Sequence, residues 1–430
     1  MAQVVILAAG KGTRMRSSRP KVLQPLCGRA MIEWVLDQAL AQEPSRIVLV
    51  VGHGADEVER LARAAAGDVP LECVVQEPQL GTGHALHVAA PALDPGTDCV
   101  VVQYGDMPLL SAASFARLLD ARAAAGAGAA ALLTAEVDDP TGYGRVLRGA
   151  DGAFRAIVEH ADATDEQRGV REVNLGVYAF PTRDLLAALP RLTSDNAQGE
   201  FYITDLVGLL AAAGGAVTAV RLADPDEARG VNDFEQLAAA RSRLQRRILA
   251  LHMRAGVFIE DPETTYIGHG VSIGPGTRIL PCTYVQSGVV IGAGCEVGPF
   301  TQLRAGTVLE DGAEVGNFTE CKNATVGPGA KAKHLSYLGD VVIGARANIG
   351  AGTIFANYDG KEKHASIVGE RAFVGSGTIV VAPNEIGSGA VTGAGAVVTR
   401  GANVAPGETW FGVPARRFEP KSKEDPERER

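Results

Sequence analysis

Apolar side chains recur at every sixth position between residues 267 and 321. Several are followed directly by glycine, as in Ile273-Gly274 and Val297-Gly298. An α-helix repeats every 3.6 residues and a β-strand every two, so neither element produces this spacing. Short strands stacked in a solenoid do produce it, because stacked turns share one interior that a single short strand cannot bury. The ten positions of the repeat are Ile267, Ile273, Ile279, Val285, Ile291, Val297, Leu303, Leu309, Val315 and Cys321.

The repeat predicts a solenoid from about residue 257 to about residue 413, with two irregularities. The period slips by one residue after Cys321, and the pattern breaks from Phe355 to Ile367. The broken segment is polar and is expected to form a loop that projects from the coil, where solenoids often carry functional groups. Between the irregularities the apolar positions are Val326, Ala332, Leu338, Ile343 and Ile349; after them come Val368, Val374, Val380, Ile386 and Val398, with Thr392 as a polar exception.

The first 230 residues show a different pattern, in which short apolar runs alternate with segments of helical length. The runs at 4–8, 46–51, 71–75, 99–103 and 129–134 are expected to be strands, and segments such as 30–41 and 112–125 helices. This alternation predicts a mostly parallel α/β sheet. Ligands of such sheets bind beyond the carboxyl ends of the strands, so the loops at those ends are candidate sites.

Between the two patterns, residues 233–255 lack glycine and proline and carry Leu237, Leu244, Ile248 and Leu251 at helical spacing. We expect one connecting helix, or alternatively the last helix of the first domain. The predicted organisation is therefore a first domain over 1–232, a linker helix over 233–256, a solenoid over 257–413 and a charged, disordered tail over 414–430.

Composition restricts the function. The chain has 430 residues and a net charge of -9, so no basic excess is present to bind a nucleic-acid backbone. The apolar start lacks a basic segment, which argues against a signal peptide or a membrane span. The six cysteines form no C-x-x-C pair, a usage typical of reduced thiols in the cytoplasm.

The first candidate site follows the first strand. Gly10 and Gly12 allow backbone N–H groups to approach phosphates, and Lys11, Arg14 and Lys21 supply cations. A plain glycine turn with solvated lysines is the alternative. Residue 15 is methionine, where a dinucleotide fingerprint has its third glycine, and no G-K-[ST] follows, so neither a Rossmann fingerprint nor a P-loop is supported.

The string from residue 7 to residue 21 resembles the signature of nucleotidyltransferases that make nucleoside-diphosphate sugars, G-x-G-T-x-M followed by P-K. Together with the hexapeptide solenoid, the chain resembles the bifunctional N-acetylglucosamine-1-phosphate uridyltransferase and glucosamine-1-phosphate acetyltransferase family from residue 2 to about 414. Further matching motifs are Q-L-G-T-G-H-A (79–85), Y-G-D-M-P-L (104–109), D-P-T-G-Y-G-R (139–145), I-V-E-H-A-D-A-T (157–164), E-V-N-L-G (172–176), N-A-Q-G-E-F-Y-I-T-D (196–205) and G-V-N (230–232).

The resemblance implies a Rossmann-like nucleotidyltransferase domain followed by a left-handed parallel β-helix. It implies acetyl transfer from acetyl-CoA to glucosamine 1-phosphate, then uridylyl transfer from UTP that gives UDP-N-acetylglucosamine, a precursor of peptidoglycan and lipopolysaccharide. A cytoplasmic homotrimer with an acetyltransferase site shared between neighbouring coils is also implied. Two rival hypotheses are a nucleotidyltransferase for another sugar or nucleotide with the solenoid as scaffold, and a non-catalytic regulatory subunit.

For the first activity, the resemblance implies an in-line attack by the sugar phosphate on UTP, assisted by Arg14 and Lys21. Asp106 and Asn232 would hold Mg²⁺, for which hard oxygen donors are suited; the alternative for Asp106 is a helix N-cap. The residues implied to bind UTP and UDP-N-acetylglucosamine are Leu7, Ala8, Ala9, Gly10, Lys21, Gln76, Gly81, Thr82, Tyr104, Gly105, Asp106, Gly142, Glu159, Asn174 and Asn232.

For the second activity, the H-L-S-Y motif implies that His334 is the general base. By the same resemblance Arg304, Lys322, Tyr337 and Asn348 would bind the sugar phosphate, and Ala351, Asn357, Tyr358, Ser376 and Ala394 would bind acetyl-CoA. The oxyanion donor stays open between Asn357 and a backbone N–H. Where the family often has an arginine near the end of the coil, this chain has Gly412, so Arg416 or Arg417 is a candidate replacement.

Overall fold

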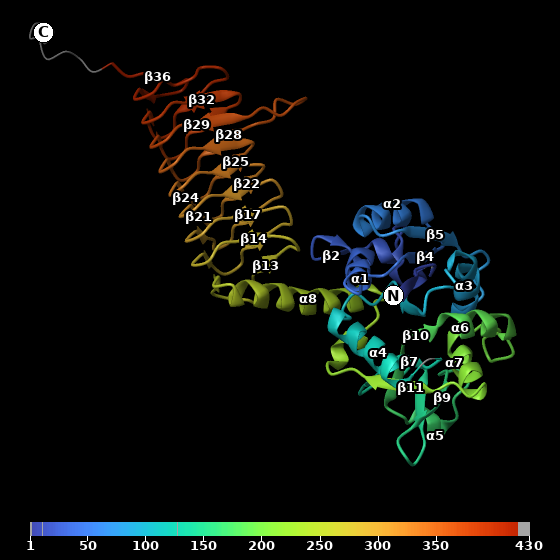
Figure 1. The fold of residues 1–430 in the computed structure, drawn as a ribbon. Helices are drawn as coiled ribbons and strands as arrows, with labels where there is room; N and C mark the ends of the chain where they lie inside the picture. The colour runs from blue at the N-terminus through green and yellow to red at the C-terminus, as the bar shows by residue number, and fades with distance from the viewer. Residues whose placement is uncertain (1, 11, 127, 420–430) are drawn as a thin grey trace, which may run out of the picture. The chain divides into compact units, whose positions relative to one another are not determined.

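The computed structural model describes residues 2–10, 12–126 and 128–419. The chain divides into two compact units, Met1–Arg243 and Leu244–Arg430 (Figure 1). The division falls inside helix α8 (Phe234–Arg254), which occupies the segment expected to connect the domains. Of the four leucines and isoleucines that suggested this helix, Leu237, Leu244 and Ile248 are buried and Leu251 is exposed.

The first unit is built on one large sheet with the strand order β11-β7-β10-β6-β1-β4-β5. All five expected strands are present. The strands of this path are β1 (Ala2–Leu7), β4 (Ile47–Val51), β5 (Leu71–Val75), β6 (Cys99–Tyr104), β7 (Ala130–Glu136), β10 (Glu172–Pro181) and β11 (Val217–Arg221). The sheet is mostly parallel, as expected, but β10 runs antiparallel to both β6 and β7. Two further antiparallel strands, β8 (Arg145–Arg148) and β9 (Phe154–Val158), extend from β10.

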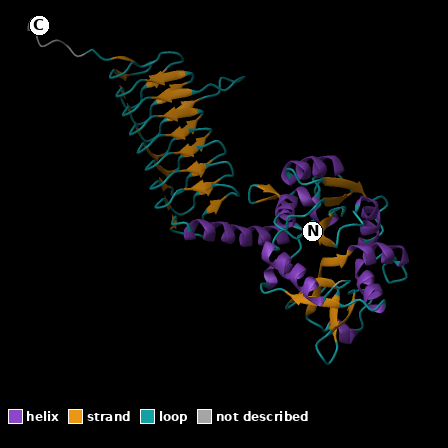
Figure 2. Ribbon diagram, viewed as in Figure 1, coloured by secondary structure: helices purple, strands orange, loops and turns teal. Residues whose placement is uncertain are grey.

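Apolar side chains fill both faces of this sheet, and Figure 2 shows the helices arranged around the strands. On one face pack α1 (Met31–Leu40), α2 (Ala55–Ala66) and α4 (Ala112–Ala125). On the other pack α3 (Thr82–Ala89), α6 (Thr182–Ala188) and α7 (Ile203–Ala212). Because helices cover both faces of this sheet, the polar groups that could act on a ligand lie at the ends of the strands.

The second unit is a coil of short parallel strands in three sheets, consistent with a left-handed β-helix. Coil sheet 1 contains β12 (Phe258–Ile259), β15 (Arg278–Ile279), β18 (Glu296–Val297), β21 (Glu314–Asn317), β24 (Lys331–His334), β27 (Asn348–Ile349), β30 (Phe373–Val374), β33 (Val391–Thr392), β35 (Thr409–Phe411) and β36 (Arg416–Arg417). Coil sheet 2 contains β13 (Tyr266–Ile267), β16 (Tyr284–Val285), β19 (Gln302–Leu303), β22 (Glu320–Lys322), β25 (Tyr337–Gly339), β28 (Ile354–Ala356), β31 (Ile379–Val381) and β34 (Val397–Val398). Coil sheet 3 contains β14 (Ser272–Ile273), β17 (Val290–Ile291), β20 (Val308–Leu309), β23 (Thr325–Val326), β26 (Val341–Ile343), β29 (Ser366–Val368) and β32 (Asn384–Ile386).

Each turn of the coil contributes one strand to each sheet, which explains the six-residue repeat. Ile279 pairs with Val297 and Val297 with Val315, a turn of 18 residues. All ten positions of the repeat are buried. Thr392 is buried too, and its hydroxyl oxygen accepts a hydrogen bond of 3.0 Å from the Gly375 N–H, so the polar exception has a partner.

Both irregularities of the repeat are visible in the pairing. Ala332 pairs with Val315, so that turn has 17 residues, and Val380 pairs with Phe355, so the later turn has 25. Phe355 is buried inside the coil, and the expectation that the break begins there is wrong. It lies one 17-residue turn after Leu338 and fills the same interior. The insertion is therefore 357–365, and Figure 1 shows it projecting from the coil beside β28.

At the end of the coil, Arg416 and Arg417 form β36, so the first part of the expected disordered tail is a strand. Residues 420–430 lie outside the described residues. Among the described residues, no helix is both long enough and apolar enough to cross a membrane.

Candidate functional sites

A cavity of about 370 Å³ opens at the carboxyl ends of β1 and β6. Ten of the residues expected to bind the nucleotide line it: Leu7, Ala8, Ala9, Gly10, Lys21, Gln76, Gly81, Thr82, Tyr104 and Asp106. Four lining residues were not expected, namely Val22, Gln79, Ala85 and Glu200. Gln79 and Glu200 lie within motifs noted in the sequence, and only their contacts show that they face the cavity.

The loop after β1 brings Lys21 to this cavity. Gly12 has a positive φ of 61°, and a Cβ atom there would lie 2.7 Å from the Cβ of Lys21. Glycine is therefore required for the close approach of the loop to Lys21. Arg14 lies in the short helix η1 (Thr13–Met15), is exposed and does not line the cavity. Lys11 is outside the described residues.

Lys21 joins the two residues that were expected to hold a metal. Its Nζ lies 2.5 Å from Asp106 Oδ2 and 3.0 Å from Asn232 Oδ1. The side chains of Lys21 and Asp106 are only 11% and 19% exposed. The Asn232 amide oxygen and the Asp106 carboxylate oxygen thus both contact the Lys21 ammonium group. Oxygen ligands of this kind also suit a bound metal cation.

Glutamine side chains hold the nucleotide loops together. Gln76 Nε2 donates to the Gly81 carbonyl over 2.9 Å, and Gln79 Nε2 donates to the Ala9 carbonyl. The Gln79 contact connects the loop after β5 with the loop after β1, and the Gln76 contact closes the loop after β5 on itself. Such contacts restrain the backbone groups of both loops, which reduces the entropy cost of binding a ligand.

The residues expected to hold the sugar, together with Asn232 and Gly105, do not line the cavity. Glu159 accepts a 3.0 Å hydrogen bond from the Thr204 hydroxyl, and burial raises the pKa of its carboxyl. Asn174 Nδ2 donates to the Tyr178 hydroxyl over 2.7 Å. Gly142 has a positive φ of 83°, and no atom within 4 Å would touch a side chain there.

Tyr104 connects the cavity with the residues that are expected to hold the sugar. Its ring lies against Gly176, where an added Cβ would be 1.9 Å from Tyr104 Cε2. Burial raises the pKa of the Tyr104 hydroxyl, and the nearby charge of Glu159 raises it further. The cavity-lining ring of Tyr104 therefore lies beside the expected sugar residues, so a nucleotide and a sugar could bind next to one another.

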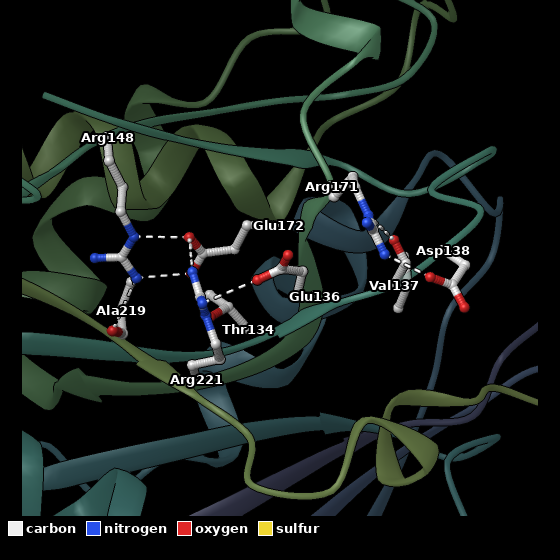
Figure 3. A network of polar contacts seen from close by, with 9 residues as sticks. All are labelled: Thr134, Glu136, Val137, Asp138, Arg148, Arg171, Glu172, Ala219 and Arg221. Atoms are coloured by element: carbon white, nitrogen blue, oxygen red, sulfur yellow. Dashed lines mark hydrogen bonds and ion pairs between the residues drawn. The ribbon is translucent and has the colours of Figure 1, made fainter.

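A charged network anchors the strand that carries Asn174. Figure 3 shows Arg148 and Arg221 converging on Glu172, two residues before Asn174 in β10. The Glu172 carboxylate accepts two hydrogen bonds of 2.7 Å from Arg148 and one of 2.7 Å from Thr134. Although burial opposes it, these contacts lower the pKa of Glu172 to about 2.

Glu172→Gln is expected to lower stability at pH 7 by on the order of 2 kcal/mol, because it leaves two arginines facing a neutral amide. The lowered pKa means that the contribution is complete above the ordinary glutamate value of 4.5 and is lost as pH falls toward 2. Urea unfolding of wild type and variant between pH 7 and pH 3 measures the difference.

The matched control is Glu136→Gln, since Glu136 also pairs with Arg221 but is 49% exposed. Exposed pairs contribute little, so this variant is expected to unfold close to wild type. A Glu172→Gln deficit that does not shrink on acidification would contradict the role assigned to the carboxylate.

In the coil, the expected base and three of the expected acetyl-CoA residues lie at one corner. His334, Ala351, Ser376 and Ala394 occupy successive turns where coil sheet 1 passes into coil sheet 2. Backbone hydrogen bonds run up this corner: Gly352 N–H to His334 O (3.3 Å), Gly377 N–H to Ala351 O (2.7 Å) and Gly395 N–H to Ser376 O (2.7 Å). We call these four residues the corner column.

His334 is oriented by the turn below it. The residue at the same place in that turn is Asn317, whose Oδ1 lies 2.9 Å from His334 Nδ1. An amide oxygen can only accept, so Nδ1 carries the proton and Nε2 is left as the basic nitrogen. Sequence reasoning missed Asn317, although its position one turn before His334 was available as a signal.

The expected phosphate-binding cations gather at a different corner, between coil sheets 2 and 3. The pKa of Lys322 is lowered, first by its contact with Lys363 of the insertion and also by the charge of Arg304. Arg304 also pairs with Glu320 at 2.8 Å. Lys363 was not among the expected site residues. Several cations at one point are suited to binding a phosphate.

The insertion is fixed on the coil by carboxylates. Asp340 accepts hydrogen bonds from Asn357 and, over 2.8 Å, from Asn323. Asp359 accepts from His364 at 2.7 Å and from Arg400 at 3.3 Å. Asn357 is therefore buried at the base of the insertion, whereas Tyr358 is 60% exposed.

Of the remaining expected sugar-phosphate residues, Tyr337 belongs to coil sheet 2, and its ring covers Gly339. Asn348 belongs to coil sheet 1. The cations therefore lie at one edge of coil sheet 2 and the corner column at its other edge.

Comparisons with known proteins identify the family of the chain. Residues 4–205 match the model of the MobA-like NTP transferase domain. The chain is 48% identical to the bifunctional protein GlmU of Alkalilimnicola ehrlichii, over 93% of this chain and 92% of that protein. It is 45% identical to the GlmU of Mycobacterium sp. strain KMS (94% and 88%) and 40% identical to that of Shouchella clausii (92% and 93%). Because these similarities span both units, the chain belongs to the bifunctional GlmU family.

Proposed function

We propose that this chain makes UDP-N-acetylglucosamine in two steps. The coil acetylates glucosamine 1-phosphate with acetyl-CoA, and the first unit then transfers a uridylyl group from UTP to the product. The observation that carries this proposal is that each unit has its own arrangement of reactive groups: Lys21 with Asp106 and Asn232, and His334 with Asn317.

For uridylyl transfer, an oxygen of the sugar phosphate attacks the α-phosphorus of UTP, and pyrophosphate leaves. Lys21 and Arg14 bind phosphate oxygens, and the backbone of residues 7–10 holds the nucleotide. Asp106 and Asn232 fit Mg²⁺, because their oxygens already converge on the Lys21 cation. The metal would supply charge neutralisation for the triphosphate. Glu159 and Asn174 orient the sugar.

For acetyl transfer, Nε2 of His334 takes a proton from the ammonium group of glucosamine 1-phosphate. The free amine attacks the thioester carbonyl, and CoA leaves as a thiolate that is then protonated. Arg304, Lys322, Tyr337 and Asn348 bind the sugar phosphate. Acetyl-CoA is bound by Asn357 and Tyr358 of the insertion and by three residues of the corner column, Ala351, Ser376 and Ala394.

The test is a coupled reaction of the purified protein with glucosamine 1-phosphate, acetyl-CoA, UTP and Mg²⁺. UDP-N-acetylglucosamine and free CoA thiol are both expected. Formation of a nucleotide sugar without thiol release would favour the alternative in which the solenoid is only a scaffold. The oriented His334 speaks against that alternative, because a scaffold does not need a histidine with a fixed basic nitrogen.

A homotrimer is part of the proposal. Within one coil the phosphate-binding cations and the corner column lie at opposite edges of coil sheet 2, so a neighbouring coil is needed to bring the two groups together. Light scattering is expected to give the mass of three chains. A monomer with full acetyltransferase activity would refute the shared site.

The cytoplasm is the proposed location. UTP and acetyl-CoA are metabolites of that compartment, and the six cysteines are all free thiols, which fits a reducing environment.

A further inference from the structure

Arg145, the first residue of β8, is a buried cation that contacts no carboxylate. The residue is 1% exposed. Among residues 2–10, 12–126 and 128–419, no carboxylate forms an ion pair with it. Its guanidinium donates to the carbonyl of Tyr143 and, over 3.4 Å, to that of Arg168, and its Nη2 lies 3.2 Å from His160 Nδ1. Buried charges are normally paired, so this arrangement needs an explanation.

The contacts of this guanidinium join three separate segments of the chain. Tyr143 lies in the loop before β8, and His160 directly follows Glu159 after β9. Arg168 is the last residue of helix α5 (Asp165–Arg168). Because a guanidinium can only donate, Nδ1 of His160 is the accepting nitrogen. All three partners are neutral, so the contacts fix the segments without neutralising the charge.

The loop before β8 packs directly on two residues that are expected to hold the sugar. The Gly144 carbonyl accepts a 2.8 Å hydrogen bond from the Asn174 N–H. A Cβ atom added at Gly144 would lie 3.3 Å from Glu159 Oε2. Arg145 itself pairs with Val173, the neighbour of Asn174, in the register of β8 and β10. Arg145 therefore connects the loop, the segment of Glu159 and the strand of Asn174.

The charge of Arg145 also acts on Glu159. Burial raises the pKa of the Glu159 carboxyl, and the nearby charges of Asp205 and Asp162 raise it further. The hydrogen bond from Thr204 and the positive charge of Arg145 oppose this shift. Since Arg145 forms no ion pair with Glu159, it favours the ionised carboxylate without occupying its oxygens.

We propose that Arg145 is a positioning residue for the sugar phosphate in uridylyl transfer, because it holds the loop before β8 against Glu159 and leaves one oxygen of that carboxylate free for the sugar hydroxyls. This inference rests on the proposed function of the first unit. Oε1 of Glu159 accepts from Thr204 over 3.0 Å, so Oε2 is the oxygen left for the ligand. An ionised carboxylate is the stronger acceptor for a hydroxyl group. Buried Arg145 acts through Glu159 and the loop, and not by contact with the sugar.

The test compares Arg145→Gln with Arg145→Lys, which keeps the charge but loses the planar fork of donors. Arg145→Gln is expected to raise the KM for N-acetylglucosamine 1-phosphate about tenfold, the usual effect of one charge-assisted contact, and to leave kcat and the KM for UTP unchanged. Arg145→Lys is expected to raise the same KM, because the loop contacts are lost.

The pH dependence of this KM separates the charge from the contacts. In every variant the KM for the sugar phosphate is expected to rise as Glu159 becomes protonated on acidification. In Arg145→Gln the rise is expected at higher pH than in wild type and Arg145→Lys, because a cation that favours the carboxylate is gone. The substrate phosphate and the other titratable groups near Glu159 are common to all three proteins; these groups are Tyr104, His160, Asp162, Tyr202 and Asp205.

His160→Leu removes one acceptor of the guanidinium and provides a second variant if Arg145→Gln does not fold. It is expected to raise the KM for the sugar phosphate about threefold and to leave the KM for UTP unchanged. Calorimetry with UTP establishes that the first unit of each variant is folded. The matched control is Arg155→Gln, which removes an arginine of the neighbouring strand β9 that is 60% exposed and paired with Asp151. It is expected to behave as wild type.

An unchanged sugar-phosphate KM in a folded Arg145→Gln protein would overturn the inference. An equal rise in the KM for UTP would overturn it too, because the effect would then be general and not specific to the sugar. If wild type makes no nucleotide sugar at all, the proposed function fails instead.

Discussion

His334→Ala is expected to reduce acetyl transfer by about 10²–10⁴-fold, the usual contribution of a general base, while uridylyl transfer stays at the wild-type rate. The sugar amine is protonated near neutral pH and cannot attack until a base takes its proton. Nε2 of His334 is the nitrogen left basic by the contact with Asn317. CoA thiol release and pyrophosphate release from the same preparation measure the two activities separately.

The control for this variant is His269→Ala, which removes the same side chain from an early turn of the coil, away from the corner column. It is expected to keep both activities. Loss of both activities in a folded His334→Ala protein would contradict the assignment of the two reactions to separate units.

Asp106→Ala is expected to give the opposite pattern, with uridylyl transfer reduced about 10³-fold and acetyl transfer unchanged. Among the described residues, Asp106 supplies the one carboxylate in contact with Lys21, so the substitution leaves a cation that is 11% exposed with the Asn232 amide oxygen as its remaining partner there. It also removes one of the two oxygens proposed to hold Mg²⁺. Pyrophosphate release with N-acetylglucosamine 1-phosphate and UTP measures the loss.

Asp68→Ala serves as the control, because it deletes an exposed carboxylate of the same unit. Direct titration with Mn²⁺, followed by electron paramagnetic resonance, adds a readout that does not depend on turnover. Undiminished uridylyl transfer in Asp106→Ala would remove this residue from the site.

The solenoid could be predicted well because its signal is periodic. Every position of the repeat from Ile267 to Cys321 is buried, since a coil of constant width places each sixth residue in the interior. The same reasoning failed at Phe355, where an insertion of polar residues immediately after a buried one hid the end of the pattern. In the first unit the expected strands are present, but apolar runs contain no information on direction, so the antiparallel course of β10 was not predicted.

The nucleotide site could be predicted only in part. The family resemblance identified Lys21, Asp106 and Gln76, and all three line the cavity. Gln79 and Glu200 face the same cavity through loop conformations that local sequence does not specify. The contact of Asn317 with His334 follows from the 17-residue turn, so the one-residue slip of the repeat after Cys321 was a signal that could have placed the two residues in register.

Each turn of the coil adds the same distance along its axis, so the number of turns sets the separation of two residues at the same corner. The distance from His334 to Ala394 is set by three turns, each of about 4.8 Å, and not by a flexible linker. Deleting one complete 18-residue turn between them would shorten that span by one step without disturbing the interior. If acetyl-CoA lies along the corner column as proposed, the number of turns above His334 sets the length of the donor that the column accommodates.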